Sequence, residues 1–442
     1  MRRRRVLLVS YHFPPVGGAG VQRPAKFARY LPEFGWDVSV LQAENPSAPL
    51  IDASLLADLP ADLVTVKART LEPGYAAKAA SGVSGGTRQG GVRALAGRAI
   101  RRVATVALQP DPQVLWLPAA RRAGRALLAR LPHDAILATA PSYSNLVLGA
   151  MLKQRSGLPL LADYRDEWDV SSAYWENAPR DPISRRIQSA MQRRVLRSAD
   201  AVIATTKAST ARLAARAMEA GASPIAECIY NGWDPGDLIA AGQATPAVPV
   251  AAGKFRLVYT GTLWNLTSIA PVVSAVEQLA QHHPALAARL ELVILGRKTP
   301  DQERLLARLS GTPTVVHQPA YAAHAVALAT MQSADALLLL LSDVPGAERV
   351  APAKLFEYLA VGRPMLAVTP DGETASIVRS VESDGWRAAH DVAGITSWLV
   401  ARLEGRTSAA LPDRDATRAG FQRRPQAAQL AALLDRVVEE RT

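Results

Sequence analysis

Two segments of this chain combine residue types that suit a ligand carrying phosphate. The first, Tyr11–Gly20, follows an apolar run that predicts a strand. Its glycines, Gly17 and Gly18 among them, would let the backbone approach a ligand, and the amides of a following helix would attract an anion. A Gly-rich turn without a ligand is the alternative, and the position after the first strand favours a binding loop. The third glycine of the dinucleotide fingerprint is missing, which weakens the case for a nicotinamide enzyme.

The second segment, residues 352–364, predicts a helix that begins near Pro352 and ends at Gly362. Ala351 is a poor N-cap, so the first amides of this helix would lack a side-chain acceptor. Lys354 and Glu357 are three residues apart and share one face. A lysine beside free amides suits a diphosphate, and a carboxylate one turn later could accept hydrogen bonds from ribose hydroxyls. An exposed Lys–Glu pair, worth a few tenths of a kcal/mol, is the alternative.

Charged residues also follow two other predicted strands. Asp163, Arg165, Asp166 and Glu167 come after the strand at 158–162, and Asp166 could orient or deprotonate an acceptor hydroxyl while Arg165 contacts phosphate. A structural Arg–Asp pair is the alternative. Arg297 and Lys298 follow the strand at 291–295, at the edge of the sheet where ligands bind. A solvated basic turn is the alternative for that pair.

Few residues suit a metal site. The one cysteine, Cys228, can form neither an intrachain disulfide nor a Cys-based zinc site, which fits a reducing cytosol. The histidines show no paired metal spacing, and the one Asp-x-Asp, residues 413–415, is expected in a charged loop. The sequence therefore predicts neither a metal nor another bound cofactor.

Short apolar runs alternate with helical stretches, which predicts parallel sheets covered by helices. Strands are expected at 6–10, 37–42, 135–138, 158–162, 201–205, 255–260, 291–295, 336–341 and 365–368, and helices at 24–31, 268–282, 301–309 and 352–361. The Gly- and Pro-rich stretch 236–254 is the expected linker between an N-terminal domain, 1–235, and a C-terminal domain, 255–425. A last helix over 426–442 could pack back on the N-terminal domain.

The formal net charge of +12 predicts attraction to polyanions. The segment 92–108 has helical spacing with several arginines and no acid, so it could lie on an anionic membrane; a surface helix with solvated arginines is the alternative. No helix-turn-helix, zinc-finger or RNP signature supports a nucleic-acid partner. The first apolar run is too short for a signal peptide, and none is long enough to span a bilayer. We expect a cytoplasmic protein, peripheral on the membrane if 92–108 binds lipid, with a mobile loop at 81–91.

Several segments resemble, in their order along the chain, a branch of the family-four retaining glycosyltransferases. They are the Phe-Pro-Pro-x-Gly-Gly-x-Gly loop within 9–38, the motifs at 110–118, 162–168 and 231–235, residues 259–263, and Lys-Leu-Phe-Glu-Tyr-Leu at 354–359. The resemblance covers nearly the whole chain. It implies an α/β GT-B fold, with two Rossmann-like domains whose parallel sheets face across an interdomain cleft that holds a nucleotide sugar. It also implies that Glu357 holds the donor ribose.

The chain departs from the pattern of that family at three places. The family typically has a second glutamate before the one that corresponds to Glu357, and the equivalent position here is Arg349, with Glu348 adjacent. Most members carry an arginine and a lysine near Gly261, where this chain has Thr262 and Thr267. Many members have a histidine in the loop after the strand that here reads 134–139, where this chain continues Thr-Ala-Pro-Ser-Tyr-Ser.

We therefore predict three groups of site residues. The candidate catalytic residues are Asp166, Glu348 and Arg349. The candidate donor-binding residues are Gly17, Gly18, Arg165, Gly261, Arg297, Lys298, Lys354, Leu355 and Glu357. The candidate acceptor-side residues are Tyr11, Arg23 and Tyr143.

The resemblance implies a glycosyltransferase that moves a sugar from a nucleotide-diphosphate sugar to a glycan or lipid-linked acceptor, with retention of configuration, in bacterial surface-polysaccharide synthesis. The scarcity of metal ligands favours transfer without a metal. Two alternatives stay open: a GT-B-fold sugar-nucleotide epimerase or hydrolase, and an inactive donor-binding scaffold in an assembly complex.

Overall fold

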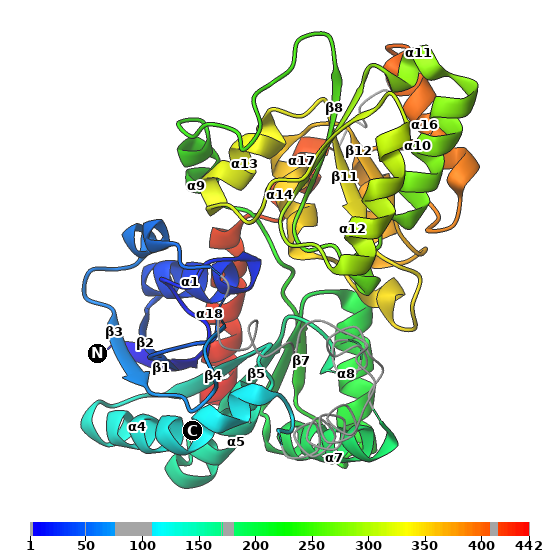
Figure 1. Ribbon diagram of the computed structural model, residues 1–442. Coiled ribbons are helices and arrows are strands. Elements are labelled where there is room, and N and C mark those ends of the chain that lie inside the picture. The colour runs from blue at the N-terminus through cyan, green and yellow to red at the C-terminus, as the bar shows by residue number, and fades with distance from the viewer. Residues whose placement is uncertain are drawn as a thin grey trace, which may run out of the picture. The chain divides into compact units, whose positions relative to one another are not determined.

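The computed structural model describes residues 3–48, 50–75, 108–168, 170, 181–406 and 414–441 (Figure 1). These residues form two compact units. Unit 1 consists of Met1–Tyr230 together with Arg423–Thr442, and unit 2 consists of Asn231–Gln422. The C-terminal segment, Arg423–Thr442, therefore belongs to the same unit as the N-terminus.

In its described part, unit 1 is built on a seven-stranded sheet in the order β3-β2-β1-β4-β5-β6-β7, with every neighbouring pair parallel. The strands are β1 (Arg4–Val9), β2 (Trp36–Ala43), β3 (Val64–Ala68), β4 (Ala135–Ala140), β5 (Leu160–Tyr164), β6 (Ala201–Ala204) and β7 (Ile225–Cys228). The helices are α1 (Ala19–Tyr30), α4 (Leu117–Arg130), α5 (Ser144–Ser156), α7 (Pro182–Ser198), α8 (Lys207–Glu219) and α18 (Arg423–Glu439), with short 3-10 helices η1 (Leu31–Phe34), η2 (Ala53–Asp58) and η3 (Pro112–Trp116).

Helices cover both faces of this sheet, as an all-parallel sheet requires. One core contains buried residues of α4, α5, α7 and α8 together with alternate residues of the central strands. The other core contains the remaining strand residues and buried residues of α1 and α18. The alternation along β1 is clear, because Leu7 and Val9 belong to the first core and Val6 and Leu8 to the second.

In its described part, unit 2 is built on a six-stranded parallel sheet in the order β10-β9-β8-β11-β12-β13. The strands are β8 (Phe255–Thr260), β9 (Leu290–Leu295), β10 (Val315–His317), β11 (Ala336–Leu340), β12 (Met365–Val368) and β13 (Trp386–Arg387). The helices are α9 (Pro235–Ala241), α10 (Ala270–His282), α11 (Pro284–Ala287), α12 (Pro300–Ala307), α13 (His324–Gln332), α14 (Ala353–Val361), α15 (Glu373–Val381), α16 (Val392–Leu403) and α17 (Arg414–Ala419), with 3-10 helices η5 (Asn265–Thr267), η6 (Arg308–Gly311) and η7 (Ala347–Arg349).

The predicted α/β class with two Rossmann-like parallel sheets is confirmed. The predicted helix at 24–31 begins earlier, at Ala19, because Gly18 adopts a positive φ of 104° and starts α1 directly after the loop. The stretch 236–254, predicted as a linker, lies within unit 2, where α9 packs against α13. The helix predicted at 426–442 is α18, which packs against α1 and η1 of unit 1. The segments 81–91 and 92–108 lie outside the described residues.

Among the residues that the structure describes, no helix has the length and apolar character that crossing a bilayer requires.

Candidate functional site

The carboxyl edge of the second sheet is built around two glycines. Gly261 follows β8 with a φ of 117°, and Gly296 follows β9 with a φ of 128°. The amide of Gly261 donates to Leu295 O at 2.8 Å, and a Cβ placed on Gly296 would lie 2.4 Å from Gly261 O. Both positions therefore need glycine, for backbone conformation and, at Gly296, for space. The two strand ends approach each other more closely than side chains would allow.

Lys354 reaches this edge from the first turn of α14. Its Nζ donates to the hydroxyl of Tyr259 at 2.8 Å and lies 4.0 Å from the centre of the Tyr259 ring. A Cβ on Gly261 would come within 2.7 Å of the same nitrogen. The absence of a side chain at Gly261 thus makes room for the ammonium group. Pro352, the N-cap of α14, provides no side-chain hydrogen bond, and Lys354 lies in the first turn, at the positive end of the helix dipole.

Within the part of the chain that the structure describes, no carboxylate pairs with the ammonium of Lys354. Among the described residues Lys354 makes no ion pair, and burial lowers the pKa of Lys354 to about 7, an effect that the nearby Glu357 carboxylate opposes. A partly buried cation without a counter-ion is costly, and an anionic ligand would remove that cost. This arrangement suits a diphosphate.

Glu357 lies on the same face of α14, and its carboxylate is oriented by a residue that the sequence did not indicate. Oε1 of Glu357 is 2.9 Å from Nε2 of His324, at the start of α13, and both side chains are largely buried. His324 is 33 residues away from Glu357 along the chain, so no spacing rule would have paired them. Tyr259 was missed for the same reason, because it contacts Lys354 only through the fold.

The two basic residues predicted after β9, Arg297 and Lys298, have different surroundings in the structure. Nζ of Lys298 donates to the carbonyls of Ile294, Gly296 and Pro319 at 2.6–3.1 Å, so Lys298 holds the loop that contains Gly296. Its predicted phosphate contact is not available in this arrangement. Arg297 is exposed, and its carbonyl accepts from the amide of Leu263 at 2.8 Å.

Three other predicted residues of unit 2 contact their own neighbours. Nη1 of Arg349 lies 2.5 Å from Oε1 of Glu348, and the second oxygen of Glu348 accepts from the amide of Gly346 at 2.9 Å. Both lie in η7 rather than on α14. Leu355 is fully buried, and its amide donates to Pro352 O at 2.9 Å, so a contact of Leu355 with a donor is not available in this arrangement.

The glycine loop of unit 1 leads into α1 as the sequence predicts. The amide of Gly17 donates to Leu50 O at 3.0 Å, and Gly18 is the N-cap of α1 without a side-chain hydrogen bond. Arg165, after β5, lies close by, since a Cβ on Gly20 would be 3.5 Å from its Nη1. Nε of Arg165 donates to Ala140 O at 3.0 Å. The fold thus places a guanidinium beside the N-terminus of α1.

Asp166 follows Arg165 and is exposed. The hydroxyl of Tyr143 donates toward the carbonyls of Asp166 and Glu167 at 3.3 and 3.2 Å, which anchors the backbone of this turn. Asp166 therefore lies at the carboxyl edge of the first sheet, where desolvation by the surrounding protein raises the pKa of its carboxyl and the Arg165 guanidinium opposes that rise.

The acceptor-side predictions differ from the structure, because all three side chains are buried. Arg23 is 1% exposed, and its Nη2 lies 2.9 Å from Asp163, which is fully buried. The hydroxyl of Tyr11 donates to Glu72, and burial raises the pKa of Tyr11. Tyr143 stacks on Trp168 at 4.6 Å between ring centres. These residues stabilise the edge of the sheet from inside rather than contacting a ligand at its surface.

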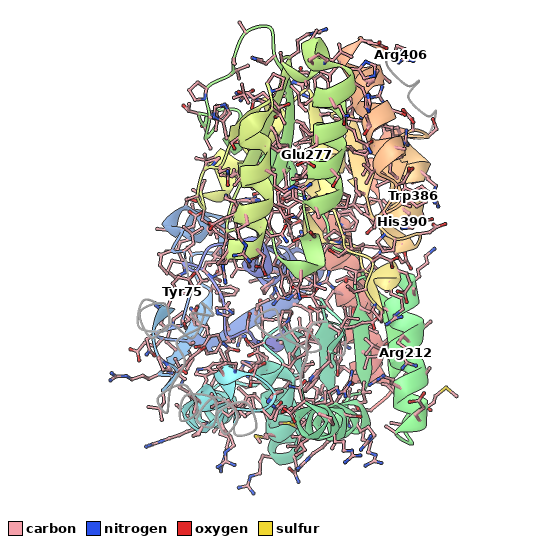
Figure 2. The ribbon with its side chains drawn as sticks, turned by 45° about the vertical axis from the view of Figure 1, so that its right-hand side comes forward. Tyr75, Arg212, Glu277, Trp386, His390 and Arg406 are labelled. Carbon is pink, nitrogen blue, oxygen red and sulfur yellow. The ribbon has the colours of Figure 1, made fainter. Side chains whose placement is uncertain are left out.

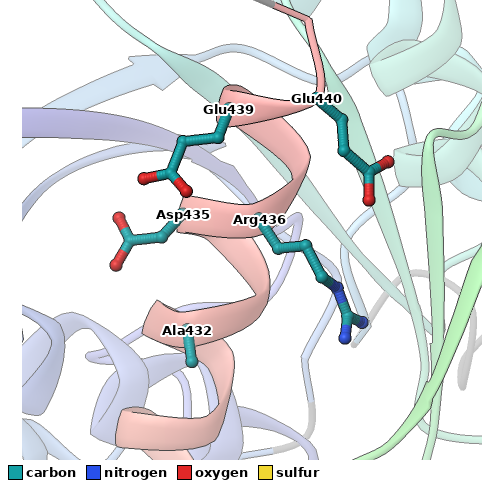
Figure 3. A pocket seen from close by; sticks show the side chains of 5 residues that line it. All are labelled: Ala432, Asp435, Arg436, Glu439 and Glu440. Carbon is teal, nitrogen blue, oxygen red and sulfur yellow. The ribbon is translucent and has the colours of Figure 1, made fainter.

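A shallow pocket of about 620 Å³ lies on α18 of unit 1, away from both glycine loops along the chain. Its lining residues are Ala432, Asp435, Arg436, Glu439 and Glu440 (Figure 3). None of the predicted site residues lines this pocket. Asp435 and Glu439 also pair with Arg4, so part of the negative charge of the pocket is already compensated. Within the described residues, no three His, Cys, Asp or Glu side chains are grouped so that they could hold a metal ion.

Comparison with known families identifies one match. Residues 17–225 match the family described as Glycosyl transferase 4-like domain. This match begins at Gly17, within the glycine loop, and covers most of unit 1. No curated protein matches the chain.

Solved structures share the fold of the whole chain. Sucrose-phosphate synthase from Thermosynechococcus elongatus is 16% identical with a TM-score of 0.65, over 99% of this chain and 100% of that one. HepE from Anabaena, in complex with UDP and glucose, is 15% identical with a TM-score of 0.59, over 98% and 99%. The lipopolysaccharide outer core galactosyltransferase WaaB is 12% identical with a TM-score of 0.56, over 97% and 99%. The two units fit the GT-B fold, and the matched domain together with this fold supports a glycosyltransferase.

The state of Lys354 predicts how stability depends on pH. Its pKa in the folded protein, about 7, lies below the ordinary 10.5, so the unfolded chain binds more protons between these values. The free energy of unfolding of the wild type relative to Lys354→Met should therefore rise as pH increases from 7 to 10. Urea denaturation of both proteins across this range measures it. A constant difference would show that Lys354 titrates normally.

The buried pair in unit 1 predicts a large loss of stability on Arg23→Met. Removing Arg23 leaves Asp163 buried without its cation, which should cost about 3–5 kcal/mol of unfolding free energy in urea denaturation. Arg29→Met is the matched control, because Arg29 lies on the same helix and pairs with the partly exposed Asp58. We expect about 1 kcal/mol or less there. Equal losses would contradict the structural role of Arg23.

Proposed function

We propose that this protein transfers a sugar from a nucleotide-diphosphate sugar to a glycan or lipid-linked acceptor, with Lys354 binding the diphosphate and Glu357 the ribose. The observation that carries this proposal is the unpaired Lys354 ammonium beside Gly261. An ammonium, free helix amides and a carboxylate one turn later provide complementary groups for the two polar parts of a nucleoside diphosphate.

The comparisons support this choice of donor and acceptor. HepE was solved in complex with UDP-glucose as well as with UDP and glucose, and WaaB is named as a lipopolysaccharide galactosyltransferase. By similarity of fold, we propose a UDP-sugar as the first donor to test. We place the acceptor in bacterial surface-polysaccharide synthesis.

The proposed chemistry needs stabilisation of one leaving group. The acceptor oxygen bonds to the anomeric carbon, the bond from that carbon to the diphosphate breaks, and the acceptor hydroxyl loses its proton. Lys354 and the amides at the start of α14 stabilise the charge on the departing diphosphate. Asp166, exposed after β5, is the proposed base, and Arg165 beside the start of α1 is a second phosphate contact. We propose retention of configuration and no metal, and a role for Glu348 and Arg349 near the sugar stays a prediction.

We also propose that the protein acts in the cytoplasm, because its single cysteine fits a reducing compartment. We propose that it works without a bound cofactor.

One observation favours a second candidate, a donor-binding scaffold without turnover. Thr262 and Thr267 carry no charge, and the hydroxyl of Thr267 donates to the carbonyl of Thr262 at 2.7 Å. Donor binding without product from any acceptor, or hydrolysis without an acceptor, would separate these alternatives from transfer.

Donor binding should depend on two residues of α14. In a thermal-shift screen against UDP, GDP, dTDP and ADP sugars, the true donor raises the melting temperature by mass action. Lys354→Met should weaken that donor roughly 10- to 150-fold in a titration, as expected for a lost charge-assisted hydrogen bond. Glu357→Gln should weaken it in the same direction.

Lys254→Met is the matched control for that experiment. Lys254 precedes β8 at the opposite end of the same strand, and its Nζ donates to Ala288 O at 2.6 Å. Its loss should leave donor affinity unchanged. Wild-type affinity in Lys354→Met would remove Lys354 from the donor site, and no shift with any nucleotide sugar would argue against the proposed function.

The lowered pKa of Lys354 predicts pH-dependent donor binding. Only the protonated lysine attracts the diphosphate, so affinity for UDP-glucose should fall as pH rises above about 7. In Lys354→Arg the charge persists over this range, so affinity, whatever its level, should vary less with pH. Isothermal titration between pH 6 and 9 measures both. Parallel pH profiles in the two proteins would contradict a role for Lys354 protonation.

A further inference from the structure

One face of unit 1 carries a concentration of arginines that the proposed transfer reaction does not use. Helices α4, α5 and α7 lie side by side, with α4 packed on α5 and α5 on α7 (Figure 1). Their apolar side chains point into the same core against the sheet. The three helices therefore form one continuous outer layer, and their polar sides face outward together.

The outward side of α4 is basic along its length. Arg121, Arg122, Arg125 and Arg130 are all exposed, and α4 contains no acidic residue. Next to it, Arg155 near the end of α5 is exposed as well, and α5 also lacks acids. Cations three and four residues apart repel each other on a helix, so this spacing does not serve helix stability.

The outward side of α7 repeats this pattern. Arg185, Arg186, Arg193 and Arg194 are exposed, and α7 contains no acidic residue between its N-cap Asp181 and its end. Within the described part of the chain, none of the exposed arginines named on α4, α5 and α7 forms an ion pair with a carboxylate. We call these residues the arginine face. Arg212 on the adjacent helix α8 is exposed too (Figure 2).

The nearest carboxylates do not neutralise the arginine face. Asp181 accepts from the amides and hydroxyl at the start of α7, where it caps the helix. Asp200, after α7, pairs with Lys153 and Arg441. The positive charge of the face is therefore uncompensated within the described structure.

We infer that the arginine face is a docking surface for a bilayer that contains anionic phospholipids. The cations extend over three helices, as contact with a plane of headgroups requires, and each arginine adds to the attraction. Ile183, 53% exposed at the start of α7 next to Arg185, provides an apolar side chain that can enter the headgroup layer. Single-stranded nucleic acid is the less suitable polyanion, because α4, α5 and α7 contain no aromatic residue on which bases could stack.

This surface is independent of the proposed donor site, because it uses residues of unit 1 that lie outside the glycine loop and unit 2. A membrane-bound position would suit an acceptor held in lipid. Failure of donor binding would leave the lipid contact unaffected, and the reverse holds equally.

The test is flotation of the full chain with vesicles of phosphatidylcholine alone and with added phosphatidylglycerol. The wild type should bind only the anionic vesicles, and raised salt should release it. The triple variant Arg125→Ala, Arg186→Ala, Arg193→Ala should bind about a hundredfold more weakly, because each arginine contributes about a factor of five at an anionic surface.

The matched control removes three exposed arginines of unit 2 with the same change in net charge, namely Arg289→Ala, Arg304→Ala and Arg308→Ala. It should bind as the wild type does. Thermal unfolding of both triple variants, with and without the donor identified above, reports whether they remain folded.

Three results would overturn the inference. Equal binding to neutral and anionic vesicles would exclude an electrostatic contact. Equal losses in both triple variants would show that net charge, and not the arginine face, controls binding. Binding to a single-stranded oligonucleotide as tight as to anionic vesicles, and lost in the same variant, would assign the face to nucleic acid instead.

Discussion

The candidate site depends on a cation that the protein holds without a counter-ion. The ammonium of Lys354 donates a hydrogen bond to the Tyr259 hydroxyl and occupies the space that the missing side chain of Gly261 leaves. No carboxylate in the described structure forms an ion pair with it. Two features of the fold create this position. The parallel arrangement brings the ends of β8 and β9 to one edge of the sheet. Gly261 and Gly296 let the two following loops approach closely, and Gly261 leaves room for the side chain of Lys354 on α14. Holding such a cation without an ion pair is unfavourable, which is the physical ground for proposing an anionic ligand there.

Arg23 in unit 1 and Lys354 in unit 2 are both cationic side chains near a sheet edge, but their electrostatic surroundings differ. In each unit a glycine with positive φ lies in the loop after an inner strand, Gly18 after β1 and Gly261 after β8. In unit 1 the guanidinium of Arg23 is closed off by Asp163, Thr139 donates to the same carboxylate, and the edge is held rigidly from inside. In unit 2 the corresponding charge is left open. A buried pair of this kind contributes to the structure, whereas an ammonium without an ion pair is available for the proposed diphosphate at the expense of stability.

The sequence predicted the centre of each sheet better than its borders. Every predicted strand matches an observed one, and the four strands without a prediction, β3, β7, β10 and β13, are the sheet edges. Edge strands are partly exposed, so they lack the continuous apolar runs that identify buried parallel strands. For the site, the spacing of Lys354 and Glu357 was enough to place both on one face of α14. Residue type alone could not tell that Arg23 and Tyr11 are buried, because their partners Asp163 and Glu72 are distant in sequence.

The neutral residues near Gly261 explain why so much depends on one lysine. Where the related glycosyltransferase pattern has charge, Thr262 and Thr267 form hydrogen bonds within the loop, and the Tyr259 hydroxyl also donates to the carbonyl of Thr262. These bonds fix the loop but contribute no positive charge. Lys298 could have supplied this missing positive charge, but its ammonium already donates hydrogen bonds to three backbone carbonyls. In the proposed donor site, the positive charge that unit 2 offers a diphosphate therefore comes mainly from Lys354 and the amides at the start of α14. Since desolvation lowers the pKa of Lys354 to about 7, which is near physiological pH, a small change in its surroundings would alter the charge of the site.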